Sequence, residues 1–427
     1  MADHHALHIR ITRNQWDNDA ADMRSTLQTW EWRWQQARTR GAVLLDFSEV
    51  NVMEPWAIAL FACFGLALQR DGVRVDVALD NTNPVNQQLE TDGIRDVLSR
   101  GAPARAADLD LTSTGLYLLH SIADGERFAR RAAALVRSAD AASGDHVQYC
   151  VGELARNVVQ HADSPGGGVA LARRAPHGGA LQIAVCDAGR GVRASLAPFY
   201  TEVQTDLEAL RLATLPHTSG AVPPGPYGSF ENMGLGLFIS KEIAWRTGGG
   251  FWLASGSALL GVRDSEHNGP QRVHRRIEPW NGTLAAVHLP DPTPTDFQDV
   301  LEVCLKAASD VQRDPASVGL EFLDASAELS DDTMRIAVAP IQDDLVGTHA
   351  LRRDQLQPAL VAGRQVALEL RDVRFLSTSI AQALLGDAFR QPGSLTKLVF
   401  LNASKSTQLA IRAVAALAKA TYRLRPS

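Results

Sequence analysis

Three short segments in the middle of the chain constrain its fold most, because each carries polar or glycine residues and they follow one another in a fixed order. Residues 153–157 are Glu-Leu-Ala-Arg-Asn, residues 187–191 are Asp-Ala-Gly-Arg-Gly, and residues 234–236 are Gly-Leu-Gly. Taken singly, each pattern is common in surface helices or tight turns. Taken in order, they predict one cleft lined by a carboxylate, a carboxamide and sharply turning backbone.

The first segment lies in residues 146–162, where apolar positions recur at helical spacing. On such a helix Glu153 and Asn157 share one face, because they are four residues apart. A carboxylate can act as a base toward water or a hydroxyl, and an amide oxygen is a hard ligand suited to magnesium. His161 follows on the same face, either near this cleft or as a satisfied histidine at the helix end.

The second segment follows an apolar run, residues 180–186, which predicts a buried strand that ends at Asp187. A carboxylate at a strand end can accept a hydrogen bond from the exocyclic amine of a base. Gly189 and Gly191 allow a sharp turn where a side chain would collide with a ligand. The third segment opens a helix predicted over residues 237–247, whose free amides would bind phosphate.

In this order and spacing the segments resemble the GHKL superfamily of ATP-binding domains, found in gyrase, heat-shock chaperones, sensor histidine kinases and mismatch-repair ATPases. The resemblance covers roughly residues 116–290 and implies ATP and Mg²⁺ as cofactors. By position it implies a catalytic base (Glu153), a magnesium ligand (Asn157), a reader of the adenine amino group (Asp187) with a supporting hydroxyl (Thr283), a neighbour of the phosphates (His161), and two glycine boxes (Gly189, Gly191; Gly234, Leu235, Gly236).

The region departs from the family pattern in two places. Asn232 and Met233 stand where many members carry a further glycine, at the end of a predicted lid over residues 192–233. Residues 264–276 form a polar insertion that we expect to be a solvated loop, with a nucleotide or partner contact as the alternative. We also expect a helix over residues 116–140, and no phosphoacceptor motif follows the histidine within it.

A β-α-β pattern flanks this region on both sides. Residues 43–50 and 73–79 predict two strands around an Ala/Leu-rich helix, and residues 367–373 and 397–401 repeat the arrangement. Both units resemble the STAS domain of bacterial anti-sigma-factor antagonists.

In that family a serine at the helix start accepts phosphate. The C-terminal copy offers Ser379, with Thr378 beside it, whereas the N-terminal copy has Pro55 and Trp56 there and cannot be phosphorylated. The alternative is that the hydroxyls from Ser377 onward only cap the helix.

Composition excludes several classes of protein. The formal net charge of −6 gives no sign of a nucleic-acid scaffold. The longest apolar stretch, residues 56–68, is shorter than the roughly 20 residues that cross a bilayer, and no leader pattern begins the chain. We expect a soluble cytoplasmic protein. The four scattered cysteines lie in apolar surroundings, which predicts buried reduced thiols.

We therefore predict an α/β protein, with a central GHKL α/β sandwich (residues 111–291) between two small STAS-like α/β domains (residues 1–110 and 296–427). The function expected is that of an ATP-binding regulatory protein, an ATPase or a serine/threonine kinase of the anti-sigma-factor type. The alternative is a non-catalytic protein whose bound ATP controls partner association. Either reading implies a protein partner, STAS-like or regulatory, with no membrane or nucleic acid, and a homodimer remains open.

Overall fold

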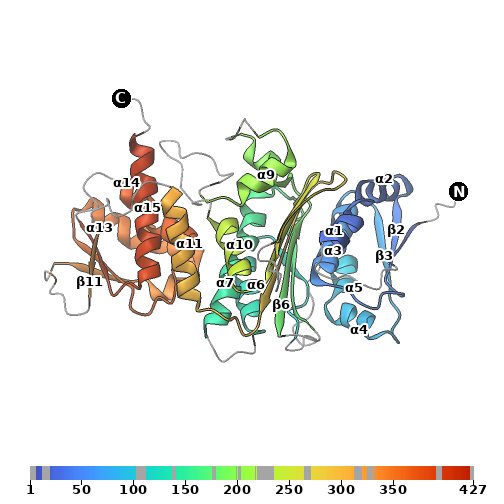
Figure 1. Cartoon of the computed structure of the whole chain (residues 1–427), viewed down its shortest axis with the longest axis horizontal. Coiled ribbons are helices and arrows are strands. Elements are labelled where there is room, and N and C mark those ends of the chain that lie inside the picture. The colour runs from blue at the N-terminus through green and yellow to red at the C-terminus, as the bar shows by residue number, and fades with distance from the viewer. Residues whose placement is uncertain are drawn as a thin grey trace. The chain divides into compact units, whose positions relative to one another are not determined.

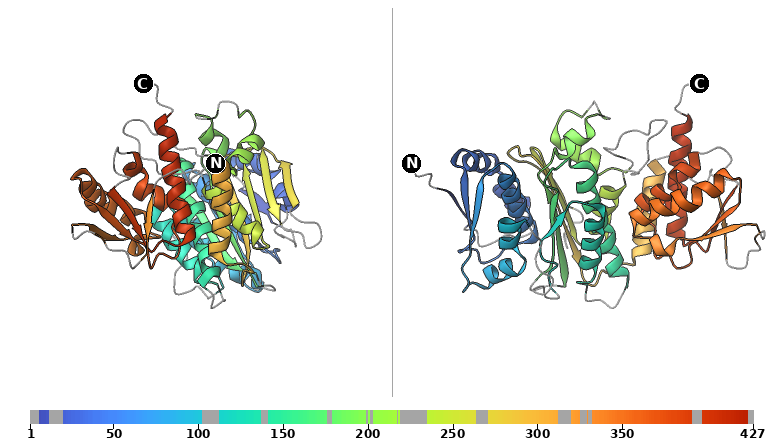
Figure 2. Two further views of the ribbon diagram at one scale, coloured as in Figure 1. Left: turned by 60° about the vertical axis from the view of Figure 1, so that its left-hand side comes forward. Right: turned by 180° about the vertical axis from the view of Figure 1, so that it is seen from behind.

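The computed structural model describes residues 6–11, 20–101, 112–136, 141–175, 179–198, 200, 203–216, 218, 235–263, 271–311, 320–324, 329, 332–390 and 397–423. The fold is mixed α/β, as predicted. The chain forms two compact units, one of residues 1–213 with 243–294 and the other of residues 214–242 with 295–427. Figures 1 and 2 show the helices and strands of both units.

A seven-stranded sheet forms the centre of the first unit, in the order β4-β5-β6-β10-β7-β8-β9, with every neighbouring pair antiparallel. Its strands are β4 (Tyr117–Leu119), β5 (Gly168–Arg174), β6 (Ala180–Asp187), β7 (Gly250–Ser255), β8 (Ala258–Arg263), β9 (Gln271–Arg276) and β10 (Thr283–Pro290). The prediction of a buried strand ending at Asp187 is confirmed, since residues 181–187 of β6 are all buried.

Helices α6 (Ile122–Ala133) and α7 (Ala141–His161) pack together over one face of this sheet (Figure 1). They approach closely, because a Cβ atom at Gly125 would lie 2.9 Å from the Cβ of Ala155. Three shorter helices follow β6 in the chain: α8 (Gly191–Leu196), α9 (Asp206–Ala213) and α10 (Gly236–Arg246).

Two predictions of local structure are wrong in part. The helix expected over residues 116–140 begins only at Ile122, where Ser121 and Asp124 form a capping box. The residues before it form β4, whose backbone pairs with β5. The solvated loop expected over residues 264–276 ends in a strand, because its last six residues pair with β8 as β9. Residues 264–270 lie outside the described part of the chain.

The described N-terminal residues of the first unit form a parallel sheet, β1-β2-β3, together with helices α1 to α5. Its elements are β1 (Leu7–Arg10), α1 (Ala20–Leu27), α2 (Trp30–Arg40), β2 (Ala42–Asp46), α3 (Pro55–Arg70), β3 (Arg74–Ala78), α4 (Pro84–Thr91) and α5 (Ile94–Arg100). The β2-α3-β3 connection between parallel neighbours confirms the first predicted β-α-β unit.

Helix α3 packs against β5, β6 and β10, on the side of the central sheet opposite α6 and α7 (Figures 1 and 2). One continuous apolar core joins the two parts. It includes Phe61 and Phe64 of α3 together with Val169, Leu171 and Trp252 of the central sheet, all buried. The sheet therefore has protein on both faces, and the N-terminal part shares its core with it.

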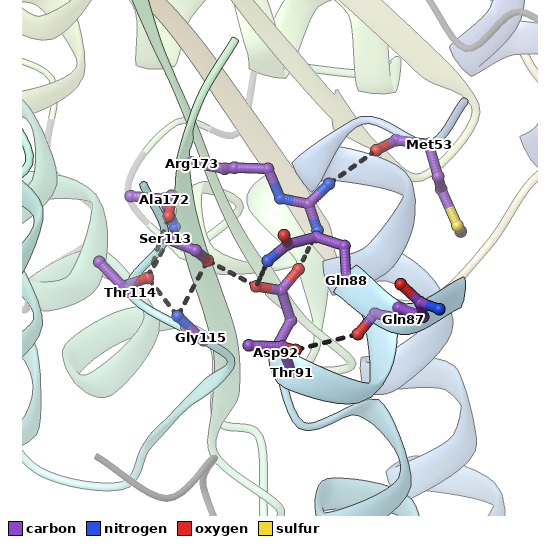
Figure 3. Close-up of polar contacts among 10 residues, drawn as sticks. All are labelled: Met53, Gln87, Gln88, Thr91, Asp92, Ser113, Thr114, Gly115, Ala172 and Arg173. Carbon is purple, nitrogen blue, oxygen red and sulfur yellow. Dashed lines mark hydrogen bonds and ion pairs between the residues drawn. The ribbon is translucent and has the colours of Figure 1, made fainter. Parts of the chain in front are cut away.

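A buried ion pair also joins these two parts (Figure 3). Asp92, fully buried at the end of α4, accepts hydrogen bonds from Ser113 Oγ at 2.6 Å and from the guanidinium of Arg173 on β5. Arg173 also donates to the carbonyl oxygen of Met53 at 3.2 Å. Burial lowers the pKa of Arg173 to about 10, against the opposing charge of Glu54, so the guanidinium is still charged at neutral pH.

The second unit contains a parallel four-stranded sheet in the order β11-β14-β13-β12. Its elements are β11 (Glu321–Leu323), β12 (Met334–Ala337), β13 (Val366–Glu369), β14 (Leu398–Leu401), α11 (Phe297–Val311), α12 (Leu345–Leu351), α13 (Gln357–Val361), α14 (Thr378–Arg390) and α15 (Lys405–Arg423). The β13-α14-β14 connection confirms the second predicted β-α-β unit. Helix α15 packs against α14 and α11.

Arg173→Met should lower the free energy of unfolding by about 3–5 kcal/mol, because it leaves the Asp92 carboxylate buried without its counter-charge. Urea unfolding followed by circular dichroism measures this loss. The matched control is Arg74→Met, which removes the exposed partner of Asp76 and should cost less than about 1 kcal/mol. Equal losses in the two variants would show that the Asp92 pair does not hold the parts together.

Candidate functional site

Helix α7 presents the first group of predicted site residues. The helix begins five residues earlier than predicted and ends at His161. Its apolar side, including Leu154, Ala155 and Val158, is buried. Glu153, Asn157 and His161 follow one another at four-residue spacing, so their side chains share one face as expected. Glu153 is 4% exposed, and its Oε1 accepts a hydrogen bond from Arg156 Nη2 at 2.7 Å.

The end of α7 meets the loop after β6 through backbone contacts. The amide of Arg190 donates to the carbonyl oxygen of Ala162 at 2.8 Å, and Arg190 Nε donates to the carbonyl oxygen of His161 at 3.0 Å. A Cβ atom at Gly189 would lie only 2.0 Å from the Ala162 oxygen. Gly189 is therefore required by this close approach, and the approach brings the α7 residues and the Asp187 loop into one site.

Asp187 lies at the end of β6 and is 3% exposed. Its Oδ1 accepts a hydrogen bond from the amide of Gly189 at 2.8 Å. Thr283, opposite it on β10, donates to the same carboxyl group from its amide and its hydroxyl. Burial raises the pKa of Asp187 to about 7, although the bonds from Gly189 and Thr283 oppose the shift. The supporting role of Thr283 toward an adenine-reading Asp187 stays a prediction.

Ser255 and Gly282 also hold the loop that follows β6, and neither is among the site residues predicted from the sequence. Ser255 Oγ, at the end of β7, donates to the carbonyl oxygen of Gly282 at 2.7 Å and accepts from the amide of Val192 at 3.0 Å. Gly191 has φ = +78°, and a Cβ atom there would lie 2.8 Å from Ser255 Oγ. A Cβ atom at Gly282 would lie 2.1 Å from the carbonyl oxygen of Asp187. No short sequence pattern identifies Ser255, because its partners are distant in the chain.

His161 is uncharged at neutral pH. Burial, and then the nearby charge of Arg190, lower its pKa to about 4. The imidazole can therefore donate or accept a hydrogen bond near a ligand, but it supplies no positive charge there. A neutral ring fits either alternative left open by the sequence, a neighbour of the phosphates or a satisfied histidine at the helix end.

The remaining predicted site residues belong to the other compact unit. Gly234 lies outside the described part of the chain, as do residues 199, 201, 202, 217 and 219–233 of the predicted lid. Leu235 precedes α10, which begins at Gly236, one residue before the predicted start. In the second β-α-β unit Ser377 Oγ accepts a hydrogen bond from the amide of Ile380 at 3.2 Å, so this residue caps α14. Its neighbours Thr378 and Ser379 are 2% and 4% exposed.

Three other expectations can be compared with the described residues. All four cysteines are buried thiols, as predicted. Within the described part of the chain, no cluster of three or more His, Cys, Asp and Glu side chains could hold a metal ion. No described helix is both long and apolar enough to span a bilayer.

Comparison with known protein families finds a match for part of the chain. Residues 142–292 match the family model of histidine kinase-, DNA gyrase B- and HSP90-like ATPases. The matched segment begins at the second residue of α7 and ends just after β10, so it contains Glu153, Asn157, His161, Asp187 and Thr283. No curated protein matches the chain. The chain thus carries a GHKL-type ATPase domain, and the resemblance stated from the sequence is confirmed for this domain.

The side chains of the site fit ATP and magnesium. Gly189 and Gly191 leave the backbone of this loop without side chains, so a ligand can approach it closely. The Asp187 carboxyl in the same loop can face an adenine amine. Among the described residues, Asn157 Nδ2 is a buried amide nitrogen that has no hydrogen-bond partner. One protein oxygen suffices for magnesium bound to nucleotide, because this ion retains waters and takes most remaining ligands from phosphates. The absence of an acidic cluster is therefore compatible with the site.

Gly189→Ala should abolish ATP binding, because the new methyl group collides with the Ala162 carbonyl oxygen and displaces the loop that carries Asp187. Isothermal titration calorimetry measures the affinity. Gly144→Ala is the matched control, since no atom lies within 4 Å of its Cβ position in α7. That variant should bind ATP normally and gain up to about 1 kcal/mol of stability. Normal binding by Gly189→Ala would show that this packing is not needed.

ATP affinity should fall as the pH is lowered below about 7, where Asp187 takes up a proton and can no longer accept through both oxygens. The expected loss is up to about tenfold for each pH unit, since the ionised fraction falls at that rate. Titrations from pH 5.5 to 8.5 measure it. Asp187→Asn is the control for protonation of ATP itself, and an identical pH dependence in both proteins would exclude Asp187 as the titrating group.

Proposed function

We propose that this protein is a magnesium-dependent ATPase whose nucleotide state regulates its association with a protein partner. One observation carries the proposal. Glu153 and Asn157 lie one turn apart on α7, and the end of that helix is hydrogen-bonded to the loop that carries Asp187. The residues proposed as base, magnesium ligand and adenine-reading carboxylate thus lie on elements joined by hydrogen bonds.

Each residue has a role that its chemistry supports. Glu153 would accept a proton from the attacking water as the bond to the γ-phosphorus forms. Asn157 would hold Mg²⁺ through its carboxamide oxygen, and the ion would neutralise charge on the phosphates. Asp187 would accept a hydrogen bond from the adenine amine. Neutral His161 would offer a hydrogen bond near the phosphates without adding a charge.

The flanking β-α-β units are the proposed partner-binding parts. Their resemblance to STAS domains suggests a regulatory protein as partner. A homodimer, common in the GHKL superfamily, is one arrangement, and the composition favours a cytoplasmic protein. The same resemblance raises a second activity, serine/threonine phosphorylation of the anti-sigma-factor type. Burial of Ser379 and Thr378 favours ATP hydrolysis over transfer to these hydroxyls, because a phosphoacceptor oxygen must reach the γ-phosphate.

Glu153→Gln should bind Mg-ATP and lose turnover by a factor of about 10²–10⁴, the usual contribution of a general base. Asn157→Ala should instead lose the magnesium dependence of ATP binding. Binding is measured by calorimetry with and without Mg²⁺, and turnover by phosphate release. Retained hydrolysis in the Glu153 variant would remove this residue from the catalytic role.

Incubation with Mg²⁺ and γ-labelled ATP separates the remaining activities. Released phosphate with no label on the protein supports the ATPase. Label that stays on the protein and disappears in Ser379→Ala would establish a kinase that acts on its own C-terminal unit. Binding without either product would leave the alternative of an ATP-gated binding protein without turnover.

A further inference from the structure

The proposed base is held by an arginine of its own helix. Arg156 Nη2 donates to Glu153 Oε1 at 2.7 Å, across one turn of α7. The two side chains are 9% and 5% exposed, so water screens their attraction little. The guanidinium lies beside Gly152, where a Cβ atom would be 3.5 Å from Nη2. A carboxylate bonded in this way is less available to accept a proton from water.

The same guanidinium retains an unused donor. Among the described residues, neither Arg156 Nε nor the neighbouring Asn157 Nδ2 has a hydrogen-bond partner, although both atoms are buried. Buried donors without partners are unfavourable, so both would gain from an acceptor. Phosphate oxygens suit a guanidinium best, because they are anionic and match its forked geometry.

We propose that Arg156 is a γ-phosphate sensor that exchanges partners when ATP binds. Without nucleotide it pairs with Glu153 and restrains the base. With ATP bound it turns to the terminal phosphate, and Glu153 is released to face water. This proposal rests on the proposed function, because it assigns a state to the same base. Arg156 is thus a positioning residue for Glu153 before binding and a phosphate contact afterwards.

The partner exchange makes a prediction about binding alone. Arg156→Gln should weaken ATP at least about tenfold, because a charge-assisted contact is lost, and leave ADP affinity unchanged. The ratio of ADP to ATP dissociation constants should therefore fall toward one. Calorimetry with a non-hydrolysable ATP analogue and with ADP measures both constants. Arg156→Lys keeps the charge without the fork and should restore part of the ratio.

A double-mutant cycle tests the competition directly. Glu153→Gln removes the competing carboxylate, so it should tighten binding of the analogue more than that of ADP. In the Arg156→Gln background the same change should have little effect. If Glu153→Gln tightens binding of the analogue equally with and without Arg156, the gain arises only from removing charge repulsion by Glu153. That result would overturn the proposed exchange of partners.

The remaining outcomes are separable from failure of the proposed function. An unmodified protein that binds neither nucleotide would refute the ATPase itself. Equal weakening of analogue and ADP in Arg156→Gln, with a lowered melting temperature, would assign Arg156 a structural role and overturn the proposal. If Arg156→Gln does not fold, Arg156→Lys and Glu153→Gln still give the two affinity ratios on folded protein.

Discussion

The site depends on one close approach of backbone to backbone, where the end of α7 meets the loop after β6. The Arg190 amide bonds to the Ala162 carbonyl oxygen at 2.8 Å, and only a glycine fits at position 189 beside it. This contact fixes the helix that carries Glu153 relative to the strand that carries Asp187. Phosphoryl transfer is catalysed mainly by positioning and by charge neutralisation, and both require the catalytic groups to be held in place beforehand. This contact holds them.

The N-terminal part supports this arrangement from the other face of the sheet. Trp30 of α2 packs edge-on against Trp280, with ring centroids 6.3 Å apart, and Trp280 comes shortly before the turn at Gly282. Gly282 and Thr283 contact Asp187 from β10. The segment that matches the ATPase family begins only at residue 142. One apolar face of its sheet is therefore buried by residues that precede this segment in the chain.

The sequence predicted those parts of the fold that depend on residues close together in the chain. The four-residue interval from Glu153 to Asn157, the apolar run before Asp187 and both β-α-β units were recovered because each is set by a few consecutive turns or strands. Strands β4 and β9 were missed, and both lie at edges of the sheet. The polar sequence of β9 hides a strand that pairs with β8, the element just before it, whereas β4 is defined by pairing with β5, which is distant in the chain. Ser255 was missed for the same reason. The Arg156 pair was within reach of the sequence, since oppositely charged residues three apart on a helix attract.

The buried charges of the first unit are of two kinds, and the difference bears on function. The Asp92 carboxylate accepts from Arg173, Ser113 and Gln88, and Arg173 also donates to the Met53 carbonyl oxygen, so these bonds across the shared core favour one packed arrangement. Arg173 Nε has no hydrogen-bond partner among the described residues. The pair formed by Glu153 and Arg156 sits beside two unpartnered donors, as far as the described residues show. Arg156 Nε and Asn157 Nδ2 lie on the helix that carries the proposed base, so an acceptor that enters there meets two buried donors that lack one. The second pair is therefore the place where nucleotide binding can alter this unit without unfolding it.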